Sequence, residues 1–231
     1  MKKALIILDN GHGENTKGKC SPDAYHLLVE SPYYLKEYAY TREIAHEIYE
    51  SLNAHDDIDC VLLVPELKDI SLSDRVNRAN VIYLQNRNKY EKILLVSIHC
   101  NAAGNGSDWL NARGWTAFTS VGLTQSDYAC RYLYEAADMY LKDYIRNFSS
   151  PDKKQRPIRD TKDISKGHER DFTILKYTKC PAVLTENLFQ DNKFDVAFLK
   201  SQKGKDAIID LHIAGILGWV YNSSSVPVIV H

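Results

Sequence analysis

Residues 4–13 read ALIILDNGHG, a short apolar run that breaks abruptly into polar residues and a histidine, His12. Residues 93–101 read ILLVSIHCN and end in the same way, with His99. Continuous Leu, Ile and Val runs are typical of parallel strands that are covered on both faces. Ligands of open α/β sheets bind just beyond the carboxyl ends of such strands. We therefore expect both histidines at one edge of a parallel sheet.

A third apolar run, residues 182–187, ends in a glutamate, Glu186. Three strand ends would then deliver two histidines and a carboxylate to the same edge. Catalytic zinc sites combine three His, Asp or Glu ligands with an open position for water. His12 and His99 supply two candidate ligands, and spacing alone leaves the third open among four carboxylates. These are Glu37, Glu30, Glu43 and Asp9.

The composition is that of an ordinary globular protein, with 44% hydrophobic and 26% charged residues among 231. A formal net charge of −1 implies no bulk attraction to nucleic acid or to an anionic membrane. No apolar stretch approaches transmembrane length. The five cysteines lack a Cys-x-x-Cys pair, which favours reduced thiols over a disulfide framework. We expect no nucleic-acid partner and no integral membrane association, and composition leaves the oligomeric state open.

Strand and helix patterns alternate along the chain. Further apolar runs predict strands at residues 59–64 and 115–119. Helical periodicity and a capping signal predict helices at 33–52, 71–88, 123–145 and 204–222. The first of these helices would bury a stripe formed by Thr41, Ile44, Ala45, Ile48 and Leu52. Residues 147–171 are polar and without periodicity, which is typical of a functional or disordered loop.

This alternation predicts the fold class and the domain organisation. We expect a single three-layer α/β domain over residues 1–222, with a mostly parallel or mixed twisted sheet and helices on both faces. Residues 223–231 would form a short C-terminal tail.

Five short motifs, in order along nearly the whole chain, match those of a known family. Residues 9–14, DNGHGE, match the family's opening Asp-Pro-Gly-His-Gly-Gly at four of six positions. The other motifs are a glutamate opening a helix ahead of an Ile-Ala pair, Leu-x-x-Arg with Ala-Asn, Ser-Ile-His-x-Asn-Ala, and Pro-Ala-Val-Leu-x-Glu with a downstream Asn. They stand here at residues 37–45, 72–80, 97–102 and 181–192. The sequence resembles the zinc-dependent N-acetylmuramoyl-L-alanine amidases of the amidase type 3 family, which are bacterial cell-wall hydrolases.

The resemblance implies a role for each candidate residue. His12, Glu37 and His99 would ligate Zn²⁺, and Glu186 would be the catalytic carboxylate outside the metal's ligands. Zinc lowers the pKa of a bound water toward about 7, which makes a nucleophile available at neutral pH. Glu186 would take the water's proton and pass it to the leaving amine. The bond cut would join the lactyl group of N-acetylmuramic acid to L-alanine of the stem peptide in peptidoglycan.

The sequence departs from the family pattern in several loops. Asn10 and Glu14 replace a proline and a glycine of the first motif. The arginine expected before Asp69 is missing, which puts a supporting ion pair in question but not the metal ligands. Residues 20–32 and 147–171 match nothing in the pattern, and we expect them to set substrate preference.

The site residues also have purely structural interpretations. A strand-end histidine is often a hydrogen-bonded structural residue, Glu37 suits a helix N-terminus, and Glu186 suits a salt bridge. Arg75 is expected to be an ion-pair partner. Cys100 is expected to point away from the histidine before it, because neighbouring strand residues face opposite sides.

Two aromatic or histidine features stay open at this point. Trp109 and the Tyr33-Tyr34 pair suit either stacking on substrate or an exposed loop without function. His168 suits either the lining of the cleft or simple solvation.

Two rival functions also stay open. One is a zinc carboxypeptidase or aminoacylase that uses the same metal chemistry on free peptides. The other is a peptidoglycan-binding domain with a vestigial site. Stoichiometric zinc would separate the second from an enzyme, and product analysis would separate the two kinds of enzyme.

The N-terminus, MKKALIILD, has an apolar run too short for a signal peptide and lacks a small-residue cleavage site. The implied substrate lies outside the cytoplasmic membrane. We therefore expect a protein made in the cytoplasm that acts on the cell wall as a phage or prophage lysin. The alternative is a secreted or periplasmic enzyme whose leader is missing from the sequence.

Overall fold

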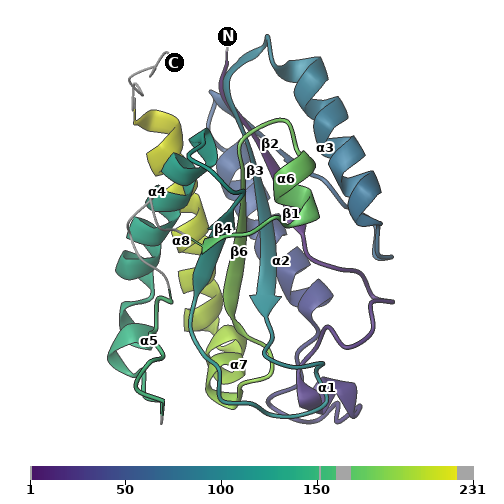
Figure 1. The fold of residues 1–231 in the computed structure, drawn as a ribbon, viewed down its shortest axis with the longest axis vertical. Helices are drawn as coiled ribbons and strands as arrows, with labels where there is room; N and C mark the ends of the chain where they lie inside the picture. Colours follow the sequence, from purple (N-terminus) through teal and green to yellow (C-terminus); the bar gives the residue numbers. More distant parts are fainter. Residues whose placement is uncertain (1, 151, 160–167, 223–231) are drawn as a thin grey trace.

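The computed structural model describes residues 2–150, 152–159 and 168–222, apart from the side chain of His168. Its centre is a six-stranded sheet with the strand order β2-β1-β3-β6-β4-β5 (Figure 1). The strands are β1 (Lys2–Asn10), β2 (Ile58–Leu62), β3 (Tyr90–Asn101), β4 (Thr116–Thr119), β5 (His168–Glu169) and β6 (Ala182–Phe189). The predicted tail and part of the predicted loop lie outside the described residues.

The middle of the sheet is parallel. β1 pairs in parallel with β2 and β3, and β3 pairs in parallel with β6. β4 runs antiparallel to β6 and parallel to β5. Residues 4–10 and 93–98 are buried along their whole length, because other elements cover both faces of the central strands. The sheet is therefore mixed with a parallel centre, as the apolar runs predicted.

Helices cover both faces and give the predicted three layers. The helices are α1 (Pro22–Tyr25), α2 (Glu37–Asn53), α3 (Leu72–Asn86), α4 (Gln125–Tyr140), α5 (Lys142–Arg146), α6 (Thr173–Tyr177), α7 (Lys193–Lys200) and α8 (Gln202–Tyr221). In Figure 1, α3 and α6 lie along one side of the strands, and α4 and α8 along the other. Among the described residues, no helix is both long and apolar enough to cross a membrane.

Two apolar clusters hold these layers together. The larger packs α2, α4 and α8 against one sheet face, which includes Leu94 and Val183. The smaller packs α3 and α6 against the other face, which includes Leu95 and Leu184. Consecutive strand residues therefore enter opposite clusters, and each large apolar side chain buried in this way contributes about 1.5–3 kcal/mol.

The helix stripe predicted from periodicity is confirmed. All five of its residues are buried on α2: Thr41, Ile44, Ala45, Ile48 and Leu52. The cap predicted at Ser71 is also present, since its hydroxyl accepts a hydrogen bond from the backbone N–H of Asp74 at the start of α3.

Several element boundaries differ from the prediction. The helix predicted at residues 33–52 is α2, which begins at Glu37 and not at residue 33. The helix predicted at 123–145 is two helices, α4 and α5, which are separated by the fully buried Leu141. No element was predicted at the position of α7, although Asn192 caps this helix by accepting from the N–H groups of Phe194 and Asp195.

Candidate metal centre

His12 follows β1 and adopts a strained backbone conformation. Its φ is +62°, in the left-handed region that costs a non-glycine residue about 1–3 kcal/mol. Two buried or half-buried arginines hold this turn, because Nη1 of Arg42 and Nη2 of Arg75 both donate to the His12 carbonyl, at 3.1 and 3.2 Å. Side chains from outside the loop thus stabilise this strained conformation. The conformation places the imidazole at the end of the sheet.

His99 packs directly against the same loop. A Cβ atom placed on Gly11 would lie 2.5 Å from Nδ1 of His99, closer than a real contact allows. Glycine at this position therefore lets the first strand end approach the second histidine. The two imidazoles meet edge to face, with ring centroids 5.0 Å apart.

Glu37 completes the cluster from the start of α2. Its carboxylate is fully buried, and Oε1 lies 3.1 Å from Nδ1 of His99 and 3.6 Å from Nε2 of His12. The backbone N–H of Cys100 donates to the same oxygen at 3.0 Å. The other oxygen, Oε2, accepts a hydrogen bond from the side chain of Gln190.

Two residues of the cluster, His12 and Glu37, have the charge state that a metal ligand needs. Burial lowers the pKa of His12 to about 4, which keeps that imidazole neutral and able to ligate. Burial raises the pKa of Glu37. The hydrogen bond from His99 and the charges of both imidazoles together lower it by more, so the net pKa is lowered and the group is a carboxylate. Conversely, burial lowers and Glu37 raises the pKa of His99, with a net upward shift.

The three side chains fit a zinc ion. One ligand atom from each of His12, Glu37 and His99 can be chosen so that all lie within 4.8 Å of one another. Two imidazoles and one carboxylate are the donor set of catalytic zinc sites that keep a position for water. Among the described ion pairs, the buried carboxylate has only these two histidines as partners, so a cation would supply the charge that it lacks.

Glu186 lies beside the cluster on β6, where it is paired with His99 across the strands. Its Oε2 atom is buried and has no hydrogen-bond partner among the described residues. Burial raises the pKa of Glu186 to about 7, against a smaller lowering by His99. A carboxyl group with a pKa near neutrality both accepts and returns a proton readily.

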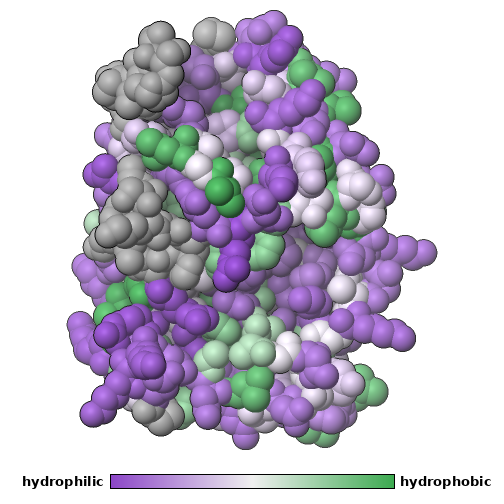
Figure 2. Space-filling view, in the orientation of Figure 1, coloured by the Kyte–Doolittle hydropathy of each residue, from purple (hydrophilic) through white to green (hydrophobic). Residues whose placement is uncertain are grey.

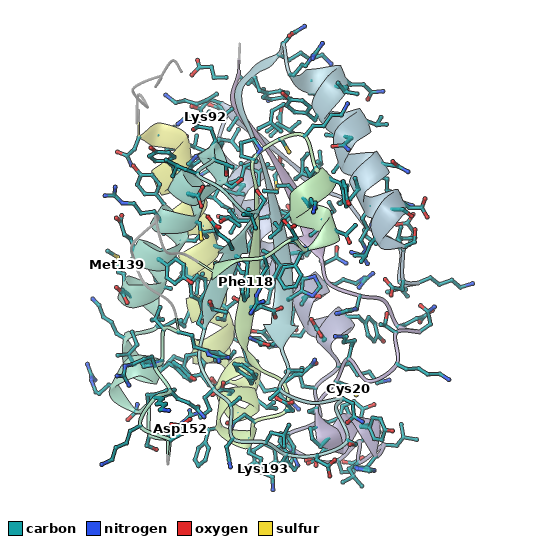
Figure 3. All side chains as sticks on the ribbon, in the orientation of Figure 1. Cys20, Lys92, Phe118, Met139, Asp152 and Lys193 are labelled. Carbon is teal, nitrogen blue, oxygen red and sulfur yellow. The ribbon has the colours of Figure 1, made fainter. Side chains whose placement is uncertain are left out.

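A cleft of about 550 Å³ opens over these residues. His12, Lys19, His99 and Glu186 lie along it together with the first residues of α3 and α6. Figure 2 shows the surface hollowed below α6, with mainly hydrophilic residues around the hollow. At the edge near β4, Phe172 contacts Phe118, which Figure 3 labels, at a centroid distance of 5.3 Å.

A buried ion pair supports the first strand end. Nη1 of Arg75 donates to Oδ1 of Asp9 at 2.6 Å, and Nη2 donates to Asp69 at 3.0 Å. Ser97 donates to the second oxygen of Asp9 at 2.6 Å. The prediction of Arg75 as an ion-pair partner is confirmed, and Arg42 also donates to the carbonyl of His12 in the loop after β1.

The structure separates Glu37 from the other candidate third ligands. Asp9 is paired with Arg75, and Glu43 pairs with Lys205. Within the described part of the chain, the group of three residues that could hold a metal ion contains Glu37 and not Glu30.

The remaining candidates have clear positions. Cys100 points into the larger apolar cluster, as predicted, and all five cysteines are free thiols. Trp109 contacts Tyr33 edge to face at 5.8 Å, so each aromatic ring already has a partner in the fold. The side chain of His168 lies outside the described atoms, and its predicted alternatives stay untested.

Sequence comparison identifies the family. Residues 6–218 match the N-acetylmuramoyl-L-alanine amidase family Amidase_3. The chain belongs to this family. An endolysin of Bacillus phage SPP1 is 29% identical over 217 residues, which are 92% of this chain and 64% of that protein. The chain thus spans less than two thirds of the length of this curated relative.

Solved amidase structures share the fold. An N-acetylmuramoyl-L-alanine amidase from Clostridium difficile 630 superposes with a TM-score of 0.71 at 22% identity, covering 96% of this chain and 100% of that one. The catalytic domain of CwlV from Bacillus (Paenibacillus) polymyxa gives 0.66 at 17% identity, covering 95% and 98%. The family and fold expected from the sequence motifs are confirmed.

Proposed function

We propose that this chain is a zinc-dependent N-acetylmuramoyl-L-alanine amidase, which hydrolyses the amide bond between N-acetylmuramic acid and L-alanine in peptidoglycan. The observation that carries the proposal is the buried cluster of His12, Glu37 and His99 with the unpartnered carboxylate of Glu186 beside it. Membership of the amidase family supports the reaction class.

The three clustered residues would hold Zn²⁺. When bound, the ion would polarise the scissile carbonyl and lower the pKa of a water molecule in its open position. Neutral His12 and the Glu37 carboxylate are already in the protonation states that ligation requires.

Glu186 carries the proton in this proposal. Its unpartnered oxygen accepts the proton of the attacking water and returns it to the nitrogen of the leaving L-alanine amine. Burial raises the pKa of Glu186 to about 7, and a carboxyl group with a pKa near neutrality both accepts and returns a proton readily. Pairing with His99 fixes the distance between the proton carrier and the metal ligands.

The setting we propose is the bacterial cell wall. Similarity to a phage endolysin supports a phage or prophage lysin that is made in the cytoplasm and released to its substrate. Residues 1–222 would form the catalytic domain. A secreted or periplasmic enzyme is the alternative.

The test is digestion of defined muropeptides by the purified protein, with and without a chelator. We expect stem peptides with a new free L-alanine amine, loss of turnover in chelator, and recovery with Zn²⁺. Release of C-terminal residues instead would favour a zinc carboxypeptidase. Binding to peptidoglycan without stoichiometric zinc or cleavage would indicate a vestigial binding domain.

A further inference from the structure

A buried amide from the far end of the chain holds the metal-facing carboxylate. Nε2 of Gln190 donates to Oε2 of Glu37 at 3.0 Å, and both residues are fully shielded from solvent. They lie 153 positions apart in the sequence, on the turn after β6 and at the start of α2. Nothing in the family motifs of the sequence singled out Gln190.

The two oxygens of Glu37 have different partners. Oε1 faces the imidazoles of His12 and His99 and the N–H of Cys100. Oε2 faces the side chain of Gln190. The amide therefore fixes the rotation of the carboxylate group and keeps Oε1 turned toward the histidines.

A strained bulge in β6 directs the chain toward α2. The register of β3 and β6 shifts between His99–Glu186 and Asn101–Phe189, so that β6 has one residue more than β3 across this interval. Leu188 lies in this bulge with φ at +63°, and its side chain enters the larger apolar cluster.

The bulge changes which face the following residues occupy. Strict alternation would place position 190 on the same face as Glu186. The extra residue shifts this phase, and Gln190 reaches Glu37 on α2 instead. A bulge that redirects a side chain next to an active site is a known use of this irregularity, and the strain of a leucine at positive φ points to a function.

The side-chain amide of Gln190 is not needed to anchor the turn after β6. The backbone N–H of Gln190 already donates to the carbonyl of Asn101 at 2.8 Å, which anchors the turn without the side chain. The Oε1 atom of Gln190 is buried without a partner among the described residues. Burying such an atom is unfavourable, so an apolar residue would suit a purely structural position better.

We propose that Gln190 is a positioning residue for the metal site, which orients the Glu37 carboxylate so that Oε1 is presented to the ion. This inference rests on the proposed role of Glu37 as a ligand, and it is independent of the identity of the substrate. Partners that orient a metal ligand typically change metal affinity about 10–100-fold when they are removed.

The test compares Q190M with N192A in the full-length protein. Methionine keeps the length of glutamine and removes the donor. Asn192 lies two residues away and caps α7 without contacting Glu37, so its loss controls for destabilisation of the same turn. The measurements are the Zn²⁺ dissociation constant, by competition with a chromophoric chelator, and the melting temperature of the metal-free protein.

We expect Q190M to raise the Zn²⁺ dissociation constant about 10-fold or more, with a metal-free melting temperature no lower than that of N192A. N192A should bind Zn²⁺ like the wild type. Equal Zn²⁺ affinity in Q190M and the wild type overturns the inference and leaves the site intact. Equal weakening in Q190M and N192A also overturns it, because the effect then follows stability alone. A wild-type protein that binds no Zn²⁺ overturns the proposed site itself.

Discussion

His99 and Glu186 are paired residues on the neighbouring parallel strands β3 and β6. The proposed ligand and the proposed proton carrier therefore lie side by side on the sheet. Their backbone positions are fixed by the β3–β6 ladder and not by loops. Chemistry placed on strand ends is held more rigidly than chemistry on flexible segments. Substitution of each residue in turn separates the roles of the two side chains.

E186Q should lose most of its turnover and retain zinc. The amide keeps the shape of the carboxyl group but cannot accept the proton, and loss of a general base lowers the rate about 10²–10⁴-fold. The measurements are kcat on a defined muropeptide and the zinc content of the purified variant. Loss of zinc from E186Q would show that Glu186 belongs to the metal's ligands.

H99A should lose the metal. His99 supplies one of the clustered ligand atoms, and two remaining ligands hold zinc weakly. Zinc content by atomic emission should fall far below stoichiometric, and added Zn²⁺ should no longer raise the melting temperature. H46Q is the control, because His46 is an exposed histidine on the outer side of α2. Normal zinc in H99A would contradict the site.

The activity should fall on the acid side of neutrality. Glu186 accepts a proton only as a carboxylate, and burial raises its pKa to about 7 in the metal-free site. A bound cation favours the charged form, so the acid limb of kcat/KM should lie at or below about pH 7. A pH profile of the wild type checks this, with the residual activity of E186Q as comparison. An unchanged acid limb in E186Q would assign it to another group.

The sequence predicted the elements that carry the chemistry because their signals are local. A buried parallel strand is a continuous apolar run, and the polar residues after it are its carboxyl end. His12, His99 and Glu186 could all be placed at one sheet edge in this way. Glu37 could not be chosen from spacing alone, because its carboxylate reaches the site only through the packing of α2 against β1 and β3.

The parts that were missed depend on irregular backbone. The left-handed conformations of His12 and Leu188 and the bulge in β6 have no residue signature, since glycine is absent from both positions. Gln190 was missed for the same reason, because strict alternation places it on the wrong face. α7 could have been predicted from Asn192, a good N-cap residue, because Val196 and Leu199 after it are buried at helical spacing.

Removal of Arg75 should destabilise the protein strongly. R75M would leave the buried Asp9 carboxylate without its cation, and breaking a buried pair in this way costs about 3–5 kcal/mol. The free energy of unfolding from urea titration measures the loss. The double variant R75M/D9N should recover part of it, because the charge that then lacks its partner, on Asp69, is partly exposed to solvent. No recovery in the double variant would mean that Arg75 acts through the carbonyls of the His12 loop instead.

His212 connects α8 to Thr185, the residue before Glu186 on β6. Its Nδ1 atom lies 2.7 Å from the carbonyl of Ile208, which can only accept, so Nδ1 carries the proton. Nε2 is then the acceptor for the hydroxyl of Thr185 at 2.9 Å. This arrangement requires a neutral imidazole, and burial lowers the pKa of His212 to about 4.

Acid should therefore destabilise the fold through His212. The unfolded chain binds this proton below its ordinary pKa of about 6.5, whereas the folded chain binds it only near pH 4. The stability is thus complete above about pH 6.5 and declines as the pH falls toward 4, by at most about 1.4 kcal/mol per pH unit for one proton. The free energy of unfolding, measured by urea titration from about pH 7.5 to about pH 5, should fall less steeply in H212Q than in the wild type. H46Q should retain the wild-type slope, and an equal slope in H212Q would show that this imidazole does not bind the proton on unfolding.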